Sequence, residues 1–129
     1  MTKLINLSEL KKRIENKREK RIIVTCGFFD FIEPWHIDLF DFAKRQGDIL
    51  SVIIFKNESQ IPVEEKQEIL SSIDVIDLIS IVKDAKVEEI FSQLNGIDIL
   101  VLNREINPNI KDLSFNYNTK HFIENKKKS

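Results

Sequence analysis

The sequence is poor in cysteine and in glycine, and each shortage excludes a class of protein. Cys26 is the single cysteine among 129 residues, so no intramolecular disulfide can form, which is typical of a protein from a reducing compartment. Gly27, Gly47 and Gly96 are the only glycines. They are too few and too far apart for the phosphate motifs G-x-x-x-x-G-K-[ST] and G-x-G-x-x-G. A phosphate-binding loop in this chain would therefore be of another kind.

An excess of charge of one sign is also lacking. The formal net charge is −1, from 20 Lys or Arg and 21 Asp or Glu, which argues against a general nucleic-acid binder. The lysine-rich tail, from about residue 124 to 129, is expected to be loosely held and solvated. The charged run at residues 17–20 is expected to solvate a connector. Asp74 and Asp77 are expected to be solvated groups in a turn.

Long hydrophobic runs are absent as well. No stretch approaches the length of a transmembrane helix. The charged first 20 residues lack the apolar segment of a signal peptide. The chain is therefore expected to be cytoplasmic, with no membrane and no nucleic acid among its partners.

The sequence does have a regular alternation of strand and helix patterns. Apolar runs predict strands at 21–26, 49–55, 75–82, 98–103 and 120–123, and stripes at helical spacing predict helices at 7–14, 34–46, 62–73 and 87–94. Ser8 is the expected start of the first helix and Pro62 the expected first residue of the third. Gly47 and Gly96 are the expected helix stops.

Continuous apolar strands alternating with helices indicate a parallel sheet covered on both faces. With right-handed crossovers this is a Rossmann-like α/β fold of three layers, with about five strands in one domain over residues 1–129. Ligands bind such sheets at the carboxyl ends of the strands, where the strand order reverses. The loop after the first strand, TCGFFDFIEPWH at residues 25–36, is therefore the expected site.

Several residues of this loop form a recognisable pattern. Thr25, Gly27, Phe29, Asp30 and His36 fall in register with [TN]-x-G-x-F-D-x-x-H-x-G-H. Further matches begin at position 43 (Ala-Lys-x-x-Gly-Asp-x-Leu), position 62 (Pro-x-Glu-x-[KR]) and position 98 (Asp-Ile-Leu-Val). In these features the chain resembles the cytidylyltransferase-like nucleotidyltransferases, over roughly residues 5 to 105. The resemblance is greatest to the branch that acts on sugar phosphates and glycerol phosphate.

The resemblance implies both an activity and a set of residues. Members of the family join a nucleoside monophosphate from CTP or ATP to a phosphate-bearing acceptor and release pyrophosphate, and they are commonly homodimers. The implied nucleotide-binding residues are Cys26, Gly27, Phe28, Phe29, Asp30, Glu33, Trp35 and His36. His36, Lys66 and Arg104 would supply positive charge in an active enzyme, with Mg²⁺ held by Glu33. No other cofactor and no dedicated metal site is expected.

The motif is degenerate where it would handle phosphate. Glu33 replaces the first histidine and Trp35 replaces the following glycine. Leu102 replaces a lysine at the end of the fourth strand, where Arg104 is near enough to substitute. The family's terminal Ser/Thr segment has no counterpart. A carboxylate near the phosphate adds repulsion in place of a charge-assisted hydrogen bond worth about 1.5–3 kcal/mol.

Three functions are consistent with this pattern. The first is a domain with impaired catalysis that retains a crevice for a nucleotide or small phosphometabolite. The second is an active, divergent enzyme that moves CMP or AMP to a sugar or polyol phosphate. The third is a non-enzymatic dimeric interaction module. The loop residues also have structural interpretations, since Glu33 suits a helix start and Cys26 and Trp35 suit packing.

Overall fold

A computed structural model describes residues 3–56, 61–83, 94, 96–102 and 121–124 of the chain. These residues form helices α1 (Leu7–Glu15), α2 (Pro34–Lys44) and α3 (Val63–Ser71), and strands β1 (Ile22–Gly27), β2 (Ile49–Lys56), β3 (Leu78–Lys83), β4 (Ile99–Leu102) and β5 (His121–Glu124). Every expected strand is confirmed, and β3 begins three residues later than expected. The expected helix at 87–94, apart from its last residue, and the expected tail beyond Glu124 lie outside the described residues.

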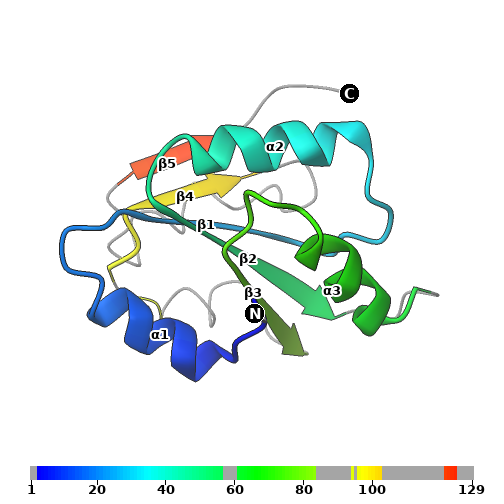
Figure 1. Cartoon of the computed structure of the whole chain (residues 1–129), viewed down its shortest axis with the longest axis horizontal. Helices are drawn as coiled ribbons and strands as arrows, with labels where there is room; N and C mark the ends of the chain where they lie inside the picture. Colours follow the sequence, from blue (N-terminus) through cyan, green and yellow to red (C-terminus); the bar gives the residue numbers. More distant parts are fainter. Residues whose placement is uncertain (1–2, 57–60, 84–93, 95, 103–120, 125–129) are drawn as a thin grey trace.

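The five strands form one parallel sheet in the order β3-β2-β1-β4-β5 (Figure 1). The chain adds β2 and β3 on one side of β1 and then returns to add β4 and β5 on the other side. The strand order therefore reverses between β1 and β4, and the carboxyl ends of these two strands mark the switch point. The Rossmann-like α/β fold expected from the sequence is confirmed.

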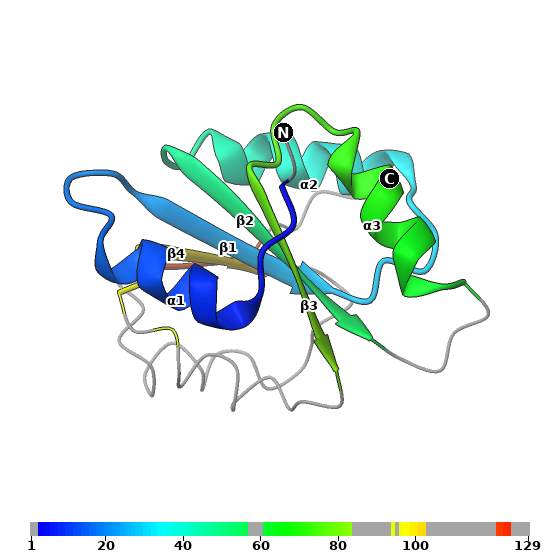
Figure 2. The same cartoon turned by 60° about the horizontal axis from the view of Figure 1, so that its bottom comes forward.

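Helices cover both faces of the sheet. Figure 2 shows α2 and α3 together on one face and α1 on the opposite face. Residues of β1 alternate between the two sides: Ile22 and Val24 pack in the core under α1, whereas Ile23 packs against Leu39 and Phe40 of α2. Two hydrophobic cores separated by the sheet explain why the strands are apolar along their whole length.

The helix starts differ slightly from those expected. The first helix is capped by Asn6, whose Oδ1 accepts the Glu9 N–H at 2.8 Å, rather than by Ser8. Glu9 in turn accepts the Asn6 N–H, which completes a capping box and fixes the start of α1. Pro62 precedes α3 as its N-cap, so the helix begins at Val63.

Gly47 is needed for a close approach rather than as a helix stop. Helix α2 ends at Lys44 with Arg45 as its C-cap. A Cβ atom at Gly47 would lie 2.1 Å from Cδ1 of Ile23 and 2.9 Å from Cβ of Arg21. Glycine therefore lets the turn between α2 and β2 pass close to the start of β1.

Carboxylates bind the amino ends of the strands. Asp98 accepts the Ile22 N–H at 2.8 Å and pairs with Lys17 Nζ at 2.7 Å. Asp48 accepts the N–H of Arg21 at 2.7 Å. These bonds satisfy backbone donors that begin the central strand, where no ladder partner precedes them.

A third carboxylate at this end corrects an expectation. Asp77, expected to be a solvated turn group, accepts the Leu50 N–H at 2.8 Å and pairs with Lys44 Nζ at 2.5 Å. Its side chain is 36% exposed. The expectation was wrong because the partners belong to α2 and β2, which only the folded chain brings together. Asp74 is exposed, as expected.

The outer side of β3 is paired by the N-terminal segment. The N–H of Ile5 donates to Ile79 O at 2.9 Å, and the N–H of Ile79 donates to Lys3 O at 2.9 Å. Leu4 and Ile79 thus form a parallel bridge. Residues 3–5 therefore continue the hydrogen-bonding pattern of the sheet past its edge strand.

Candidate functional site

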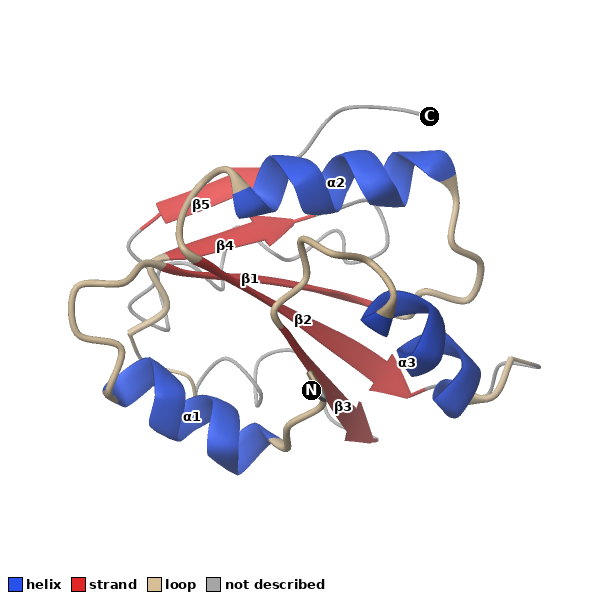
Figure 3. Ribbon diagram, viewed as in Figure 1, coloured by secondary structure: helices blue, strands red, loops and turns tan. Residues whose placement is uncertain are grey.

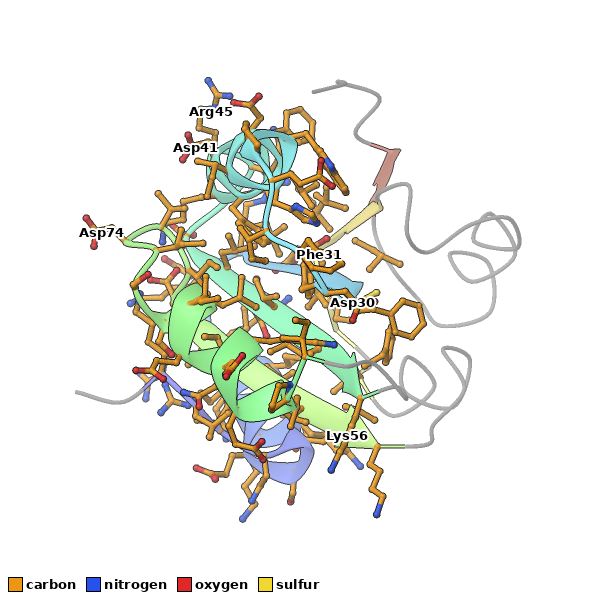
Figure 4. All side chains as sticks on the ribbon, turned by 90° about the vertical axis from the view of Figure 1, so that its right-hand side faces the viewer. Asp30, Phe31, Asp41, Arg45, Lys56 and Asp74 are labelled. Carbon is orange, nitrogen blue, oxygen red and sulfur yellow. The ribbon has the colours of Figure 1, made fainter. Side chains whose placement is uncertain are left out.

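The loop between β1 and α2 leaves the carboxyl end of β1, at the switch point of the sheet. Figure 3 shows this loop in tan at the right of the molecule, close to α3. Figure 4 views the molecule from that side, with Asp30 and Phe31 labelled beside each other. The eight expected nucleotide-binding residues run from the end of β1 through this loop into the first turn of α2, and α3 brings Lys66 to the loop from another part of the chain. Arg104 lies outside the described residues.

His36 lies in the first turn of α2 and is held by the residue that precedes this helix. Its Nδ1 accepts the N–H of Glu33 at 2.9 Å, and its own N–H donates to Glu33 O at 2.9 Å. The first bond requires an Nδ1 without a proton. The backbone at the helix start therefore fixes both the position and the orientation of the imidazole.

Aromatic rings enclose this imidazole. The Trp35 indole stacks on it, with centroids 3.8 Å apart and planes at 26°. Phe29 contacts it at a centroid distance of 5.7 Å and a tilt of 58°. The resulting exposure is only 2% for His36 and 9% for Trp35. Trp35 thus packs on His36, its neighbour in the chain.

Phe29 adopts an unusual backbone conformation to reach this position. Its φ of 52° lies in the left-handed region, which costs a residue with a Cβ about 1–2 kcal/mol. The ring is completely buried and also contacts Phe40 of α2, with centroids 5.7 Å apart. Burial of the ring in the core beneath α2 offsets the strain.

Lys66 forms an ion pair with the loop. Its Nζ lies 2.6 Å from Oδ1 of Asp30. Lys66 is buried, with 1% of the residue exposed, whereas the Asp30 side chain is 36% exposed. The pair joins α3 to the β1–α2 loop and neutralises the lysine within the protein.

The remaining loop residues point in several directions. Cys26 is buried in the core under α1, and Phe28 packs against Phe55 on that same side, with ring centroids 6.0 Å apart. Glu33 is exposed at the start of α2, and Phe31 is 70% exposed. Only part of the predicted set therefore gathers at one place.

Sequence reasoning missed the contacts of Lys66 and His36. Asp30 and Lys66 are 36 positions apart, and no local spacing signals their contact. The enclosure of His36 had one available signal: Trp35 and Phe29 both take motif positions beside it.

Among the residues that the structure describes, no group of three or more His, Cys, Asp or Glu is arranged to hold a metal ion. In the same part of the chain, no helix is long and apolar enough to cross a membrane.

No family model matches the chain. A curated relative, "Bifunctional protein HldE" of Desulfatibacillum aliphaticivorans, is 33% identical over 118 residues. The match covers 89% of this chain but 24% of that protein, so the chain spans about a quarter of the relative's length.

Solved structures share the fold. A lipopolysaccharide core biosynthesis protein from Thermoplasma volcanium GSS1 matches with a TM-score of 0.74 and 16% identity, over 85% of this chain and 99% of that one. Pantoate-beta-alanine ligase from Francisella tularensis, solved with beta-gamma ATP and beta-alanine, matches with a TM-score of 0.63 and 17% identity, over 99% of this chain and 69% of that one. Both structures share the Rossmann-like fold of this chain. The Thr25–His36 motif lies at the switch point of that fold, in agreement with the resemblance of the chain to the cytidylyltransferase-like nucleotidyltransferases.

Proposed function

We propose that this chain is a cytidylyltransferase-like domain that binds a nucleotide or small phosphometabolite in the crevice beyond β1 and is impaired in nucleotidyl transfer. One observation carries the proposal: Lys66 and His36, the two motif residues in the described part of the chain that would meet a phosphate, are both engaged within the protein. Lys66 pairs with Asp30 at 2.6 Å, and His36 is 2% exposed beneath Trp35.

The chemistry of the reaction makes these contacts important. Nucleotidyl transfer passes through a five-coordinate α-phosphorus, and a protein accelerates it mainly by directing positive charge and N–H donors at the phosphate oxygens. A phosphate that engaged Lys66 would have to compete with the Asp30 carboxylate. A phosphate that engaged His36 would have to displace the stacked indole. Both steps oppose the binding that catalysis requires.

The start of α2 adds an unfavourable charge. A helix N-terminus attracts phosphate through its N–H groups and its dipole, and α2 begins at Pro34 with Glu33 exposed before it. The Glu33 carboxylate therefore competes for the same positive end of the helix. Proline at the first helical position also removes one N–H donor.

The comparisons support a nucleotide as the ligand class. The pantoate-beta-alanine ligase structure holds an ATP compound on the same fold. The loop motif of this chain is most similar to the sugar-phosphate branch, which makes a sugar or polyol phosphate the preferred second ligand. Mg²⁺ would enter only with a nucleotide, held by Glu33 and the phosphates.

A second candidate function is a dimeric interaction module, favoured by Phe31. An aromatic side chain that is 70% exposed at a loop is the kind of group that protein interfaces bury. Light scattering at increasing concentration distinguishes a homodimer from the monomer that would argue against this function.

The proposal is tested by restoring the motif. We expect the natural chain to release pyrophosphate from CTP or ATP at background rate in the presence of sugar or polyol phosphates. Glu33→His/Trp35→Gly should gain a nucleotide-dependent thermal shift, because it removes a carboxylate and uncovers His36. The control Glu68→His makes the same Glu-to-His change at an exposed position of α3 and should show no nucleotide-dependent thermal shift.

Loss of the indole can itself destabilise the fold by about 3 kcal/mol or more. Glu33→His alone keeps Trp35 and is the second variant, for which a smaller gain in nucleotide-dependent thermal shift is expected. Circular dichroism establishes that each variant is folded before ligand is added. Robust pyrophosphate release by the natural chain would refute impaired catalysis. The absence of a nucleotide-dependent thermal shift in both folded variants would refute nucleotide binding in the crevice.

A further inference from the structure

The end of α1 and the connector to β1 surround a hollow that is separate from the crevice. Its volume is about 380 Å³, and it is widely open to solvent. The residues that line it are Lys12, Arg13, Asn16, Lys17, Arg18, Lys20 and Ile49. Five of these seven side chains are cationic and none is acidic. We call this feature the basic hollow.

Local backbone structure brings the cations together. Lys12 and Arg13 lie in the last turn of α1. After α1 the chain turns tightly, and the Lys20 N–H donates to Lys17 O at 3.1 Å. Within this turn Arg18 has a φ of 59°, in the left-handed region that residues with a Cβ usually avoid. The turn places connector cations alongside the helix end.

The concentration of charge is strong for a chain that is close to neutral. Residues 11–21 contain seven Lys or Arg and two Glu, a net charge of +5, whereas the whole chain carries −1. All residues outside this segment therefore carry −6 together. An anion that approaches the molecule is attracted to this end of the sheet and repelled by most of the rest.

Structural roles account for some of these cations but not for all. Lys12 and Arg13 complement the negative end of the α1 dipole, and Lys17 pairs with Asp98 at 2.7 Å. Arg18 and Lys20 are exposed, and within the described ranges neither forms an ion pair. No contact within the described fold therefore explains why these two cations line the hollow.

The hollow lies at the opposite end of β1 from the crevice. In Figure 3 the connector from α1 enters β1 at the left, and the loop to α2 leaves β1 at the right. Six strand residues at about 3.3 Å each separate the two ends by roughly 20 Å. A ligand in the basic hollow therefore does not occupy the nucleotidyltransferase motif.

We infer that the basic hollow binds a small oligophosphate anion. Linked phosphates carry several negative charges within a few ångströms, which matches several cations around one concavity. A single carboxylate would neutralise only one of them. Nucleic acid would require a longer basic track along the surface, which the acidic balance of the remaining chain opposes. Inorganic oligophosphate and the phosphates of a free nucleotide share the chemistry that this site recognises.

Calorimetric titration of the whole chain with sodium tripolyphosphate tests the inference. The variant Arg18→Gly/Lys20→Ala removes the two unexplained cations, and glycine keeps the backbone conformation at position 18 without strain. We expect affinity to fall about tenfold or more. The control Lys11→Ala/Lys83→Ala removes the same charge from exposed positions that do not line the hollow, and should change affinity by less than about twofold. An unchanged α-helical circular dichroism signal establishes that α1 is intact.

Equal weakening in both double variants, or no heat from the natural chain at millimolar tripolyphosphate, would overturn the inference. Titration with CTP separates the two possible sources. CTP that loses affinity with Arg18→Gly/Lys20→Ala binds by its phosphates in the hollow. CTP binding that survives in this variant, while tripolyphosphate binding is lost, assigns the nucleotide to the crevice and inorganic oligophosphate to the hollow. Preference for a short oligonucleotide over tripolyphosphate would contradict a small-anion site. The proposed function in the crevice can fail without affecting this result.

Discussion

The two ends of the sheet use charged residues in contrasting ways. At the amino ends of the strands, Asp48, Asp77 and Asp98 each accept a backbone N–H, so the carboxylates complete the architecture. At the carboxyl ends, Asp30 accepts from a lysine side chain that the family motif would direct at phosphate. The same residue type caps strand N–H groups at one end and pairs with a lysine side chain at the other. At the carboxyl end, the aspartate therefore joins two elements, the β1–α2 loop and α3.

The largest expected effect is at the amino end, at Asp98. Asp98→Ala leaves the Ile22 N–H and the Lys17 ammonium without their carboxylate, and both lie in a largely buried setting. Removing one partner of a buried ion pair costs about 3–5 kcal/mol, and we expect a loss of that size in the free energy of unfolding measured with urea. Asp74→Ala, at an exposed turn, is the control and should stay within about 0.5 kcal/mol. A small loss for Asp98→Ala would mean that the amino-end carboxylates are dispensable.

The next largest effect is expected at the carboxyl end, where a substitution should increase ligand affinity. Asp30→Asn removes the charge that neutralises Lys66, so it should raise nucleotide affinity about tenfold, measured by calorimetry. Because the Lys66 side chain is only 2% exposed, loss of its charged partner should also lower the free energy of unfolding by about 3 kcal/mol. Asp38→Asn, a carboxylate on α2 outside the motif, should leave affinity unchanged. Unchanged nucleotide affinity in folded Asp30→Asn would show that the ion pair does not control the crevice.

The smallest effect is expected at Asp48, which can be compared with Asp98 at the same end of the sheet. Asp48 is exposed and accepts one N–H, that of Arg21, at 2.7 Å. Asp48→Ala should therefore cost about 1 kcal/mol in urea unfolding, well below the cost at Asp98. Asp48→Asn retains an acceptor oxygen and should recover part of the loss. Equal losses in the free energy of unfolding for Asp48→Ala and Asp98→Ala would show that burial does not determine how much these carboxylates contribute.

The sequence predicted the fold well because its signals are local. Apolar runs and helical stripes depend on neighbouring residues, and they placed all five strands. The details that depend on contacts across the chain were missed: Asp77 meets Lys44 of α2, and Gly47 passes Ile23 of β1. Asn6 was missed for another reason, since Asn and Ser cap helices equally well and spacing alone did not separate Asn6 from Ser8.

The candidate site was predicted in position but not in arrangement. The motif located the loop at the switch point of the sheet, where the structure has it. The motif could not reveal that Trp35 stacks on His36 or that Lys66 pairs with Asp30, because these contacts depend on side-chain orientation. The motif also gave no indication of the basic hollow, and the sequence analysis interpreted residues 17–20, which supply three of its cations, as a solvated connector.

The pairing of residues 3–5 with the outer side of β3 bears on the tendency of this protein to aggregate. An uncovered edge strand offers its N–H and C=O groups to other molecules and promotes intermolecular sheet growth. Here Lys3 and Ile5 occupy the groups of Ile79. Removal of residues 3–5 would uncover the N–H and C=O groups of Ile79 on the outer side of β3 and should favour aggregation through this edge.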